Sequence, residues 1–307
     1  MNTRRIIFYV ATDWAVGSVH YELTKYLQAH DIDASVLSWD NDYSLQEMHE
    51  LSNQIDLFVS LPRGIAELID RYNIPAEKCV LIAHAVLDLE HFAIFSDENK
   101  ARMHGYAVVS DWLAQQSQHQ NIGRTPTIVP VGINYNKFYA PVSSELRTIG
   151  FAATYHEEGF KIEGREKEPA FKKRGYLVHR LAEKSGLNFT IAQTYHHSYV
   201  TMPGYYPTTD CIVIASTEEG AGLPALEAGA AGRLVITTPV GHYSRIGSKG
   251  AHIVPVDEKE FLTAAWALLL FYKNNPDAYQ KKCQEIQEHA RSYDWSCVID
   301  KWIEVLK

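Results

Sequence analysis

The chain has 307 residues, 46% of them hydrophobic and 21% charged, so it exceeds the usual size of one domain and we expect two domains, each with its own core. This composition is ordinary for a globular protein and excludes a disordered or collagen-like chain. The formal net charge of −8 gives no general attraction to phosphate backbones, which argues against nucleic acid as a partner.

The first part of the chain alternates strand-like apolar runs with helical patterns, which is the signature of parallel βαβ units. The first strand follows residues 1–5 without a signal-type apolar region, and no apolar run approaches the roughly 18 residues that a membrane-spanning helix needs. We therefore expect a cytoplasmic protein. The predicted strands cover residues 5–11, 34–37, 56–61, 78–83, 106–109 and 127–131, and the predicted helices cover residues 19–30, 64–72 and 111–119.

A second series of the same kind begins near residue 146. Its predicted strands cover residues 147–153, 188–192, 211–215, 234–238 and 251–254, and its predicted helices cover residues 175–185, 258–274 and 277–292, with a further helix starting at residue 224. We expect an N-terminal domain over residues 1–143, a C-terminal domain over residues 144–292, and a last helix over residues 293–307 that packs back on the first domain. Both domains are then α/β, Rossmann-like and doubly wound. Since open parallel sheets bind ligands outside the carboxyl ends of their strands, the site is expected in the cleft between two facing domains.

The segment from Ser216 to Gly241 (STEEGAGLPALEAGAAGRLVITTPVG) follows a predicted buried strand and carries most of the functional information. Gly220 and Gly222 allow backbone conformations closed to other residues and a close approach by a ligand. Pro224 suits the first turn of a helix, where its missing N–H costs nothing. The unpaired N–H groups of that turn, together with the positive end of the helix dipole, favour a bound diphosphate.

Two carboxylates, Glu219 and Glu227, stand on either side of this turn with seven residues between them. Carboxylates accept hydrogen bonds well from the vicinal hydroxyls of a sugar or a ribose. A simpler explanation is that these acids form a solvated surface and complement the dipole of the helix that follows. The two carboxylates alone favour the simpler explanation.

The complete string from Glu219 to Gly232 (EGAGLPALEAGAAG) closely resembles the E-x7-E segment of the retaining GT-B glycosyltransferases of family 4, the group 1 glycosyltransferases. The stretch from Val108 to Pro141 is similar to the segment that closes the first domain in that family, with Gly132 and Asn134 at matching positions. The resemblance implies the GT-B fold, in which two facing Rossmann-like domains enclose a cleft.

The resemblance also implies two site residues in the first domain. Gly17 lies where the family carries a glycine-rich turn whose backbone N–H groups help to bind the leaving phosphate. A tight turn with Ser18 as the helix N-cap is an equally good explanation of that loop. His84 follows a predicted strand at a position where the family often has a histidine that reaches the donor sugar near its anomeric carbon. A lone histidine after an apolar run is otherwise more often a core residue.

The family places a basic pair after the first strand of the second domain to neutralise the diphosphate. Here that region contains extra residues and offers Arg165, Lys172, Lys173 and Arg174. We choose Lys173 first and Arg165 second, and the alternative is a charged, exposed loop. The adjacent histidines at positions 196 and 197 lack a convincing ligand set, so no metal is expected.

The resemblance therefore implies a retaining, metal-independent glycosyltransferase that needs no cofactor and moves a sugar from a UDP- or GDP-linked donor to a hydroxyl acceptor, in glycan or glycoconjugate biosynthesis. The acceptor is a glycan, a lipid-linked compound or another hydroxyl compound, and a peripheral membrane contact stays open. The alternatives are a GT-B protein that binds a sugar nucleotide without transferring the sugar, and an epimerase. The predicted roles are catalytic for Glu219, His84 and Lys173, diphosphate binding for Gly17, Arg165, Lys173, Gly220, Gly222 and Leu223, and sugar or ribose binding for Glu219 and Glu227.

Overall fold

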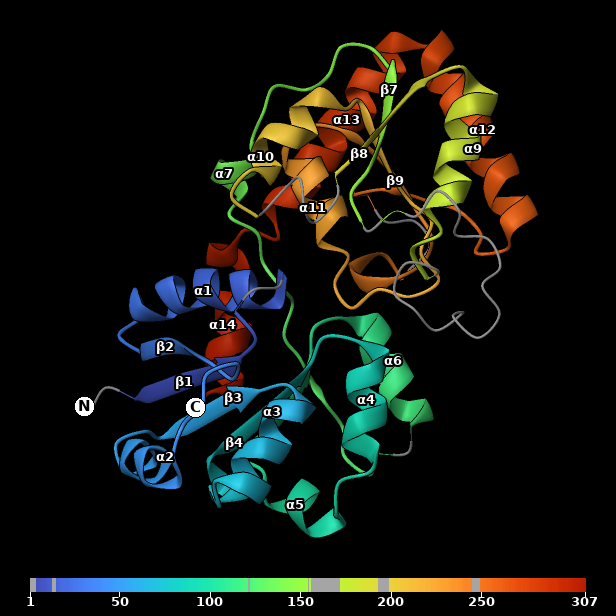
Figure 1. Ribbon diagram of the computed structural model, residues 1–307. Helices are drawn as coiled ribbons and strands as arrows, with labels where there is room; N and C mark the ends of the chain where they lie inside the picture. Colours follow the sequence, from blue (N-terminus) through green and yellow to red (C-terminus); the bar gives the residue numbers. More distant parts are fainter. Residues whose placement is uncertain are drawn as a thin grey trace. The chain divides into compact units, whose positions relative to one another are not determined.

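The computed structural model describes residues 4–12, 15–120, 122–153, 155, 172–192, 199–244 and 249–307. It separates into two compact units (Figure 1), unit 1 with Met1–Gly132 and Trp295–Lys307, and unit 2 with Ile133–Asp294. The division lies earlier than the predicted boundary at residue 143. The reason is that the backbone N–H of Ile133 donates to the carbonyl of Tyr293 at 2.9 Å, so the chain already pairs with unit 2 at this point.

Unit 1 contains, within the described residues, a parallel six-stranded sheet of order β2-β1-β3-β4-β5-β6. Its central strands are buried along their whole length, as expected for a parallel sheet covered on both faces. The strands are β1 (Arg5–Val10), β2 (Asp33–Ser38), β3 (Leu57–Ser60), β4 (Cys79–Ala83), β5 (Gly105–Val108) and β6 (Thr127–Ile128). The carboxyl ends of β1 and β4 lead into the segments that carry Gly17 and His84.

The helices of unit 1 pack in two groups, α1 with α14, and α3, α4 and α6 in series (Figure 1). Their bounds are α1 (Ala15–Gln28), α2 (Leu45–Ser52), α3 (Pro62–Ala66) with a π-helical turn (Glu67–Arg71), α4 (Val86–Ala93), α5 (Asp97–Arg102), α6 (Asp111–His119) and α14 (Trp295–Val305). The sequence did not predict α2, α4 and α5, which are too short for a clear apolar period. Side-chain caps define two of them: the hydroxyls of Ser44 and Ser96 accept from the backbone at the starts of α2 and α5.

Helix α14 belongs to unit 1 although it ends the sequence. The indole N–H of Trp302 donates to the carbonyl of Pro130 at 2.8 Å, and the side chains of Trp295 and Trp302 are both almost fully buried. Burial of two such large rings contributes strongly to the stability of this unit.

Unit 2 contains, in its described part, a parallel five-stranded sheet of order β11-β10-β9-β7-β8. The strands are β7 (Thr148–Phe151), β8 (Asn188–Ile191), β9 (Cys211–Ile214), β10 (Leu234–Thr237) and β11 (His252–Ile253). The helices are α7 (Tyr135–Phe138), α9 (Gly175–Ser185), α10 (Met202–Tyr205), α11 (Leu223–Ala230), α12 (Glu258–Asn274) and α13 (Pro276–Arg291), with short 3-10 turns at Tyr206–Thr208 and Gly241–Tyr243.

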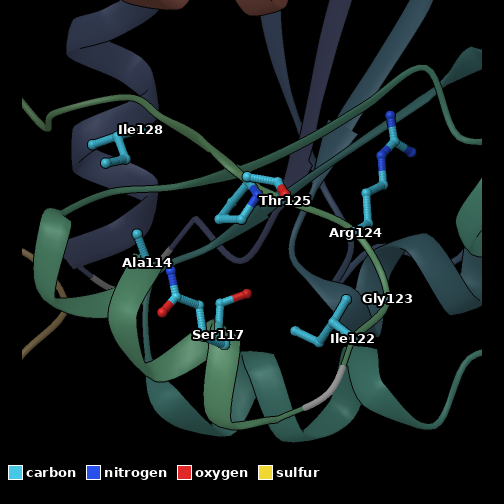
Figure 2. Close-up of a pocket in the computed structure, with 9 residues that line it drawn as sticks. Ala114, Ser117, Ile122, Gly123, Arg124, Thr125 and Ile128 are labelled. Atoms are coloured by element: carbon cyan, nitrogen blue, oxygen red, sulfur yellow. The ribbon is translucent and has the colours of Figure 1, made fainter.

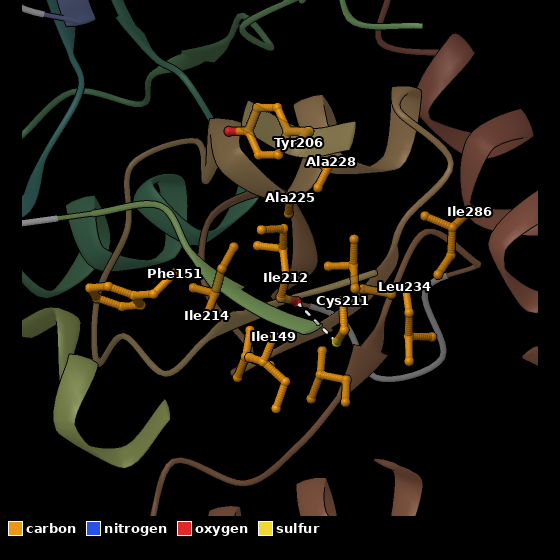
Figure 3. Close-up of a cluster of buried hydrophobic side chains, with 14 of the residues drawn as sticks. Ile149, Phe151, Tyr206, Cys211, Ile212, Ile214, Ala225, Ala228, Leu234 and Ile286 are labelled. Carbon is orange, nitrogen blue, oxygen red and sulfur yellow. Dashed lines mark hydrogen bonds between the residues drawn. The ribbon is translucent and has the colours of Figure 1, made fainter. Parts of the chain in front are cut away.

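The core of unit 2 is formed by its sheet together with helices α9, α11, α12 and α13, and Figure 3 shows part of it. Small side chains such as Ala225 and Ala228 let α11 approach the strands closely, and Gly229 lets it approach α13. A Cβ at Gly229 would lie 3.2 Å from a methyl group of Ile286. Helix α11 is thereby fixed at the end of β9. Among the described residues, no helix is both long and apolar enough to cross a bilayer.

Candidate functional site

The turn between β9 and α11 has the geometry that the glycine pattern predicts. Gly222 is the N-cap of α11 and adopts φ 76° and ψ 43°, a left-handed conformation that favours glycine. A Cβ built on Gly222 would meet no atom of the described structure within 4 Å, so open space faces this backbone. Pro224 occupies the first turn of the helix. The arrangement can hold an anion against the helix N-terminus.

The loop after β10 supports this turn from the other side. Gly241 has φ 57°, and a Cβ there would lie 2.5 Å from the carbonyl oxygen of Ala221. The next backbone N–H, of His242, donates to the same oxygen at 3.1 Å. Gly241 was not among the predicted site residues, although the Pro-Val-Gly sequence directly after a predicted strand was a usable signal for a turn.

Glu219 and Lys173, both predicted as catalytic, lie together in unit 2. Their carboxylate oxygen and ammonium nitrogen are 2.5 Å apart, and the hydroxyl of Ser216 donates to the other oxygen of Glu219 at 2.7 Å. The neighbouring residues form a second ion pair between Lys172 and Glu218. The side chains of Glu219 and Lys173 are 14% and 26% exposed, so a ligand can still reach both groups.

Arg174, which follows the two lysines in the chain, is nearly buried and is bound by backbone carbonyls. It is 7% exposed, adopts φ 48°, and donates from Nε to the carbonyl of Ala215 at 2.5 Å and from Nη1 to that of Val256 at 2.6 Å. The backbone N–H of Thr217 also donates to the carbonyl of Lys172 at 2.9 Å. Two backbone carbonyls thus bind Nε and Nη1 of Arg174, and its Nη2 is buried without a hydrogen-bond partner among the described residues.

Arg165, the second choice for the diphosphate, lies outside the described residues. The histidines at positions 196 and 197 also lie outside them. Within the described ranges, no group of three or more His, Cys, Asp or Glu side chains is arranged to hold a metal ion.

Glu227, the predicted ribose ligand, is only 5% exposed in unit 2. Its carboxylate accepts a hydrogen bond from the hydroxyl of Tyr206, which is itself fully buried. Burial raises the pKa of Glu227 to about 7, although the Tyr206 hydrogen bond and the charge of Lys137 act in the opposite direction. The sequence predicted the position of this acid on α11 but gave no sign of its burial.

In unit 1, Gly17 lies inside the first turn of α1, because the helix begins at Ala15 and not at residue 19 as predicted. Ser18 is therefore not the N-cap. A Cβ at Gly17 would lie 2.6 Å from the carbonyl oxygen of Ala11 and 2.7 Å from Cα of Thr12. The absence of a side chain at this position lets α1 begin directly against the segment that follows β1.

His84 follows β4 and is held by the next helix, α4. Its backbone N–H donates to the carboxylate of Asp88 at 2.7 Å, and the N–H of Ala85 donates to the same oxygen at 2.9 Å. Burial lowers the pKa of His84 to about 4, so its imidazole is neutral at pH 7. Its ring packs against the ring of His20 from α1, with centroids 5.2 Å apart.

A hollow of about 460 Å³ lies elsewhere in unit 1, between α6 and the segment before β6 (Figure 2). Ser117 and Arg124 are among its lining residues, but none of the predicted site residues lines it. Arg124 donates to the carbonyls of Lys100 and Met103 at 2.9 Å each. Its guanidinium thus stabilises the end of α5.

A family model described as "Glycosyl transferases group 1" matches residues 160–270. This range includes Lys173, Glu219 and Glu227, and it excludes Gly17 and His84. No curated protein sequence matches the chain.

Solved structures match the chain over nearly its whole length at low sequence identity. Sucrose-phosphate synthase from Thermosynechococcus elongatus has a TM-score of 0.66 at 11% identity, covering 99% of this chain and 98% of its own. Anabaena HepE in complex with UDP has a TM-score of 0.62 at 14% identity, covering 98% and 99%. An α-glucosyltransferase in complex with UDP and a DNA 13-mer has a TM-score of 0.62 at 13% identity, covering 99% and 100%.

The narrower assignment to family 4 stays a prediction. The two parallel sheets with their covering helices agree with these structural matches over both units. The chain has the fold of the GT-B glycosyltransferases, and its residues 160–270 match the model of the group 1 glycosyltransferases.

Proposed function

We propose that the protein is a retaining, metal-independent glycosyltransferase that moves a sugar from a nucleoside diphosphate sugar to a hydroxyl acceptor. The observation that carries this proposal is the ion pair of Lys173 with Glu219, because Glu219 lies on the segment that leads into the Gly222 turn and the N-terminus of α11. A cation and a helix N-terminus can bind the diphosphate of a sugar nucleotide. A carboxylate can accept hydrogen bonds from the hydroxyls of its sugar.

Negative charge builds on the diphosphate as the bond to the sugar breaks. Fixed donors aimed at this charge lower the barrier, and they do so most effectively where water is excluded. In unit 2 we assign this role to Lys173 and to the backbone amides of Gly220, Gly222 and Leu223, with Arg165 as a second cation. In unit 1 the backbone of Gly17 has the same role.

Glu219 is assigned to the hydroxyls of the donor sugar and His84 to the region of its anomeric carbon. When the donor binds, Lys173 exchanges its contact with Glu219 for one with the diphosphate, and Glu219 accepts from the sugar. Two ligand groups then take the place of the two partners of this ion pair. No cofactor is required for this chemistry.

Glu227 is assigned to the ribose of the nucleotide, with its orientation fixed by the hydroxyl of Tyr206. We propose UDP as the first candidate for the nucleotide, because HepE and the α-glucosyltransferase were both solved with UDP, and GDP as the second. The acceptor is proposed to be a glycan or lipid-linked hydroxyl compound of cytoplasmic glycan biosynthesis. The net charge of −8 disfavours a DNA acceptor such as the one bound to the α-glucosyltransferase.

The test is incubation of the purified protein with UDP- and GDP-linked sugars, with and without a panel of hydroxyl acceptors. A transferase releases free nucleotide faster when its acceptor is present, and the product keeps the anomeric configuration of the donor. Interconversion of the sugar nucleotides would instead identify an epimerase. Thermal stabilisation by the nucleotide sugar without any release would identify a binding protein.

The decisive variant is Glu219→Ala, with Glu218→Ala as its matched control. Both residues form an ion pair with a neighbouring lysine, but only Glu219 has an assigned contact with the donor sugar. We expect transfer to be lost in Glu219→Ala and retained in Glu218→Ala. Equal activity of the two variants would show that the assignment of Glu219 is wrong.

A further inference from the structure

His20 lies on α1 of unit 1 and was not singled out by the sequence. Its side chain is 1% exposed, and its ring contacts three aromatic rings. The centroid distances are 5.0 Å to Phe8, 6.4 Å to Trp302 and 5.2 Å to His84, and the ring planes of the two histidines are inclined by 72°. The ring of His20 is thus packed on several sides, and one of the rings that it contacts is His84, the predicted catalytic residue of this unit.

The backbone and the side chain of His84 are held by different elements. Asp88 on α4 binds the N–H groups of His84 and Ala85, which fixes the backbone. Within the described residues, Nε2 of the His84 ring is buried and has no hydrogen-bond partner. The orientation of this ring therefore depends on what packs against it, and the ring of His20 packs against it.

We propose that His20 is a positioning residue, which holds the imidazole of His84 by an edge-to-face ring contact in the orientation needed at the donor sugar. The proposal rests on the proposed function for its catalytic consequence, while the contact itself is independent of any activity. Edge-to-face contacts between rings have a preferred geometry, so they fix an orientation as well as exclude water.

The surroundings keep both histidines neutral. Burial lowers the pKa of His20 well below its usual range and that of His84 to about 4. Asp88 accepts from the backbone N–H groups of His84 and Ala85. Burial raises the pKa of Asp88 to about 6, although these hydrogen bonds and the charge of His91 lower it. A neutral imidazole has one donor and one acceptor nitrogen; the tautomer decides which is which, and the ring orientation decides where each nitrogen points.

The first test compares His20→Ala, which removes the ring, with His20→Phe, which keeps an aromatic edge. We expect His20→Ala to lower kcat by about 10- to 100-fold with little change in KM for the donor, because a small misplacement of a catalytic group has an effect of this size. His20→Phe should keep most of the activity. Equal losses in the two variants would overturn the proposal.

The second test repeats His20→Ala in a His84→Ala background. If His20 acts through His84, the second substitution lowers the remaining activity no further, since residues that act as a unit are not additive. An additive loss would mean that His20 merely stabilises unit 1. Leu27→Ala is the matched control, because Leu27 is a fully buried residue of the same helix. It should lower the unfolding temperature without changing kcat.

The third test needs no activity and uses NMR titration of the His84 ring. In the wild type the ring should remain neutral down to about pH 4. In His20→Ala, water enters beside the ring and the pKa of His84 should rise toward its usual value. An unchanged titration would overturn the proposal even if the protein transfers sugar. If the wild type transfers no sugar but the pKa of His84 still rises in His20→Ala, the proposed function is overturned and the ring contact is upheld.

Discussion

The candidate site residues of the two units differ in the kind of interaction that holds them. In unit 2, Lys173 and Glu219 form an ion pair with a second one beside it, and both side chains are partly exposed. In unit 1, His84 and His20 are neutral rings that pack against each other. Charge thus holds the candidate residues of unit 2, and packing holds those of unit 1.

We therefore expect the two units to respond differently to a substitution. Charged groups that pair with each other in the absence of a ligand are stable until the ligand competes for them, so removal of one charge affects ligand binding more than folding. Packed rings and a glycine without space around it are fixed by volume, so added or removed atoms affect the local structure first.

Lys173→Met should have the largest effect. We expect kcat/KM for the nucleotide sugar to fall by about 100- to 1,000-fold, which is typical when one donor to a developing negative charge is removed. Lys172→Met is the matched control, because Lys172 forms an equivalent ion pair with Glu218 but has no assigned contact with the diphosphate. Steady-state kinetics of both variants checks this, and a similar loss in Lys172→Met would mean that the two lysines act only through general charge.

Glu227→Gln should separate stability from binding. The pKa of Glu227 is raised from 4.5 to about 7, so the folded state binds a proton more tightly than the unfolded state does. The cost of keeping this carboxylate ionised is therefore absent below pH 4.5 and fully present above pH 7. A shift of this size corresponds to about 3 kcal/mol at pH 8.

We thus expect Glu227→Gln to unfold at higher denaturant concentration than the wild type at pH 8 and at about the same concentration near pH 4.5. Its affinity for UDP, measured by calorimetry at pH 8, should fall because the ribose loses an ionised acceptor. If Glu227→Gln were less stable than the wild type at pH 8, the ionised carboxylate of Glu227 would not destabilise the folded protein.

The fold was largely predictable because its strands and long helices leave regular patterns. Helices α9 (Gly175–Ser185) and α12 (Glu258–Asn274) begin and end at the predicted residues. The start of α1 was missed because Gly17 is a poor helix former, and only its tight contact with Ala11 and Thr12 reveals why a glycine is needed inside this turn.

The parts of the site formed by residues close together in the sequence were predictable. The parts formed by residues that only the fold brings together were not. The Gly222 turn follows from the sequence, because glycine spacing and Pro224 specify it. Three other features join segments that lie far apart in the chain. They are the hydrogen bond of Tyr206 to the buried Glu227, the hydrogen bonds of Arg174 to two backbone carbonyls, and the ring contact of His20 with His84. A single sequence carries no periodic signal for such pairings.

Gly17→Ala should damage unit 1 through volume alone. The added methyl group would lie 2.6 Å from the carbonyl oxygen of Ala11, which is a backbone atom that cannot move independently. We expect a loss of about 1 to 3 kcal/mol in the free energy of unfolding, as for overpacking elsewhere. Denaturant unfolding measures it, and an unchanged free energy would mean that the start of α1 shifts easily.

Gly222→Ala should affect ligand binding more than stability, and its effect on stability should be the smallest of these variants. No atom of the described structure lies within 4 Å of the added methyl group, so only the left-handed conformation at φ 76° opposes it. That conformation costs about 1 to 2 kcal/mol for a residue other than glycine. The methyl group would, however, occupy the space assigned to the diphosphate. UDP affinity should therefore fall by more than the stability does, whereas in Gly17→Ala binding should fall only as far as unit 1 is distorted. If Gly222→Ala bound UDP as tightly as the wild type, the open space beside this turn would not be where the diphosphate lies.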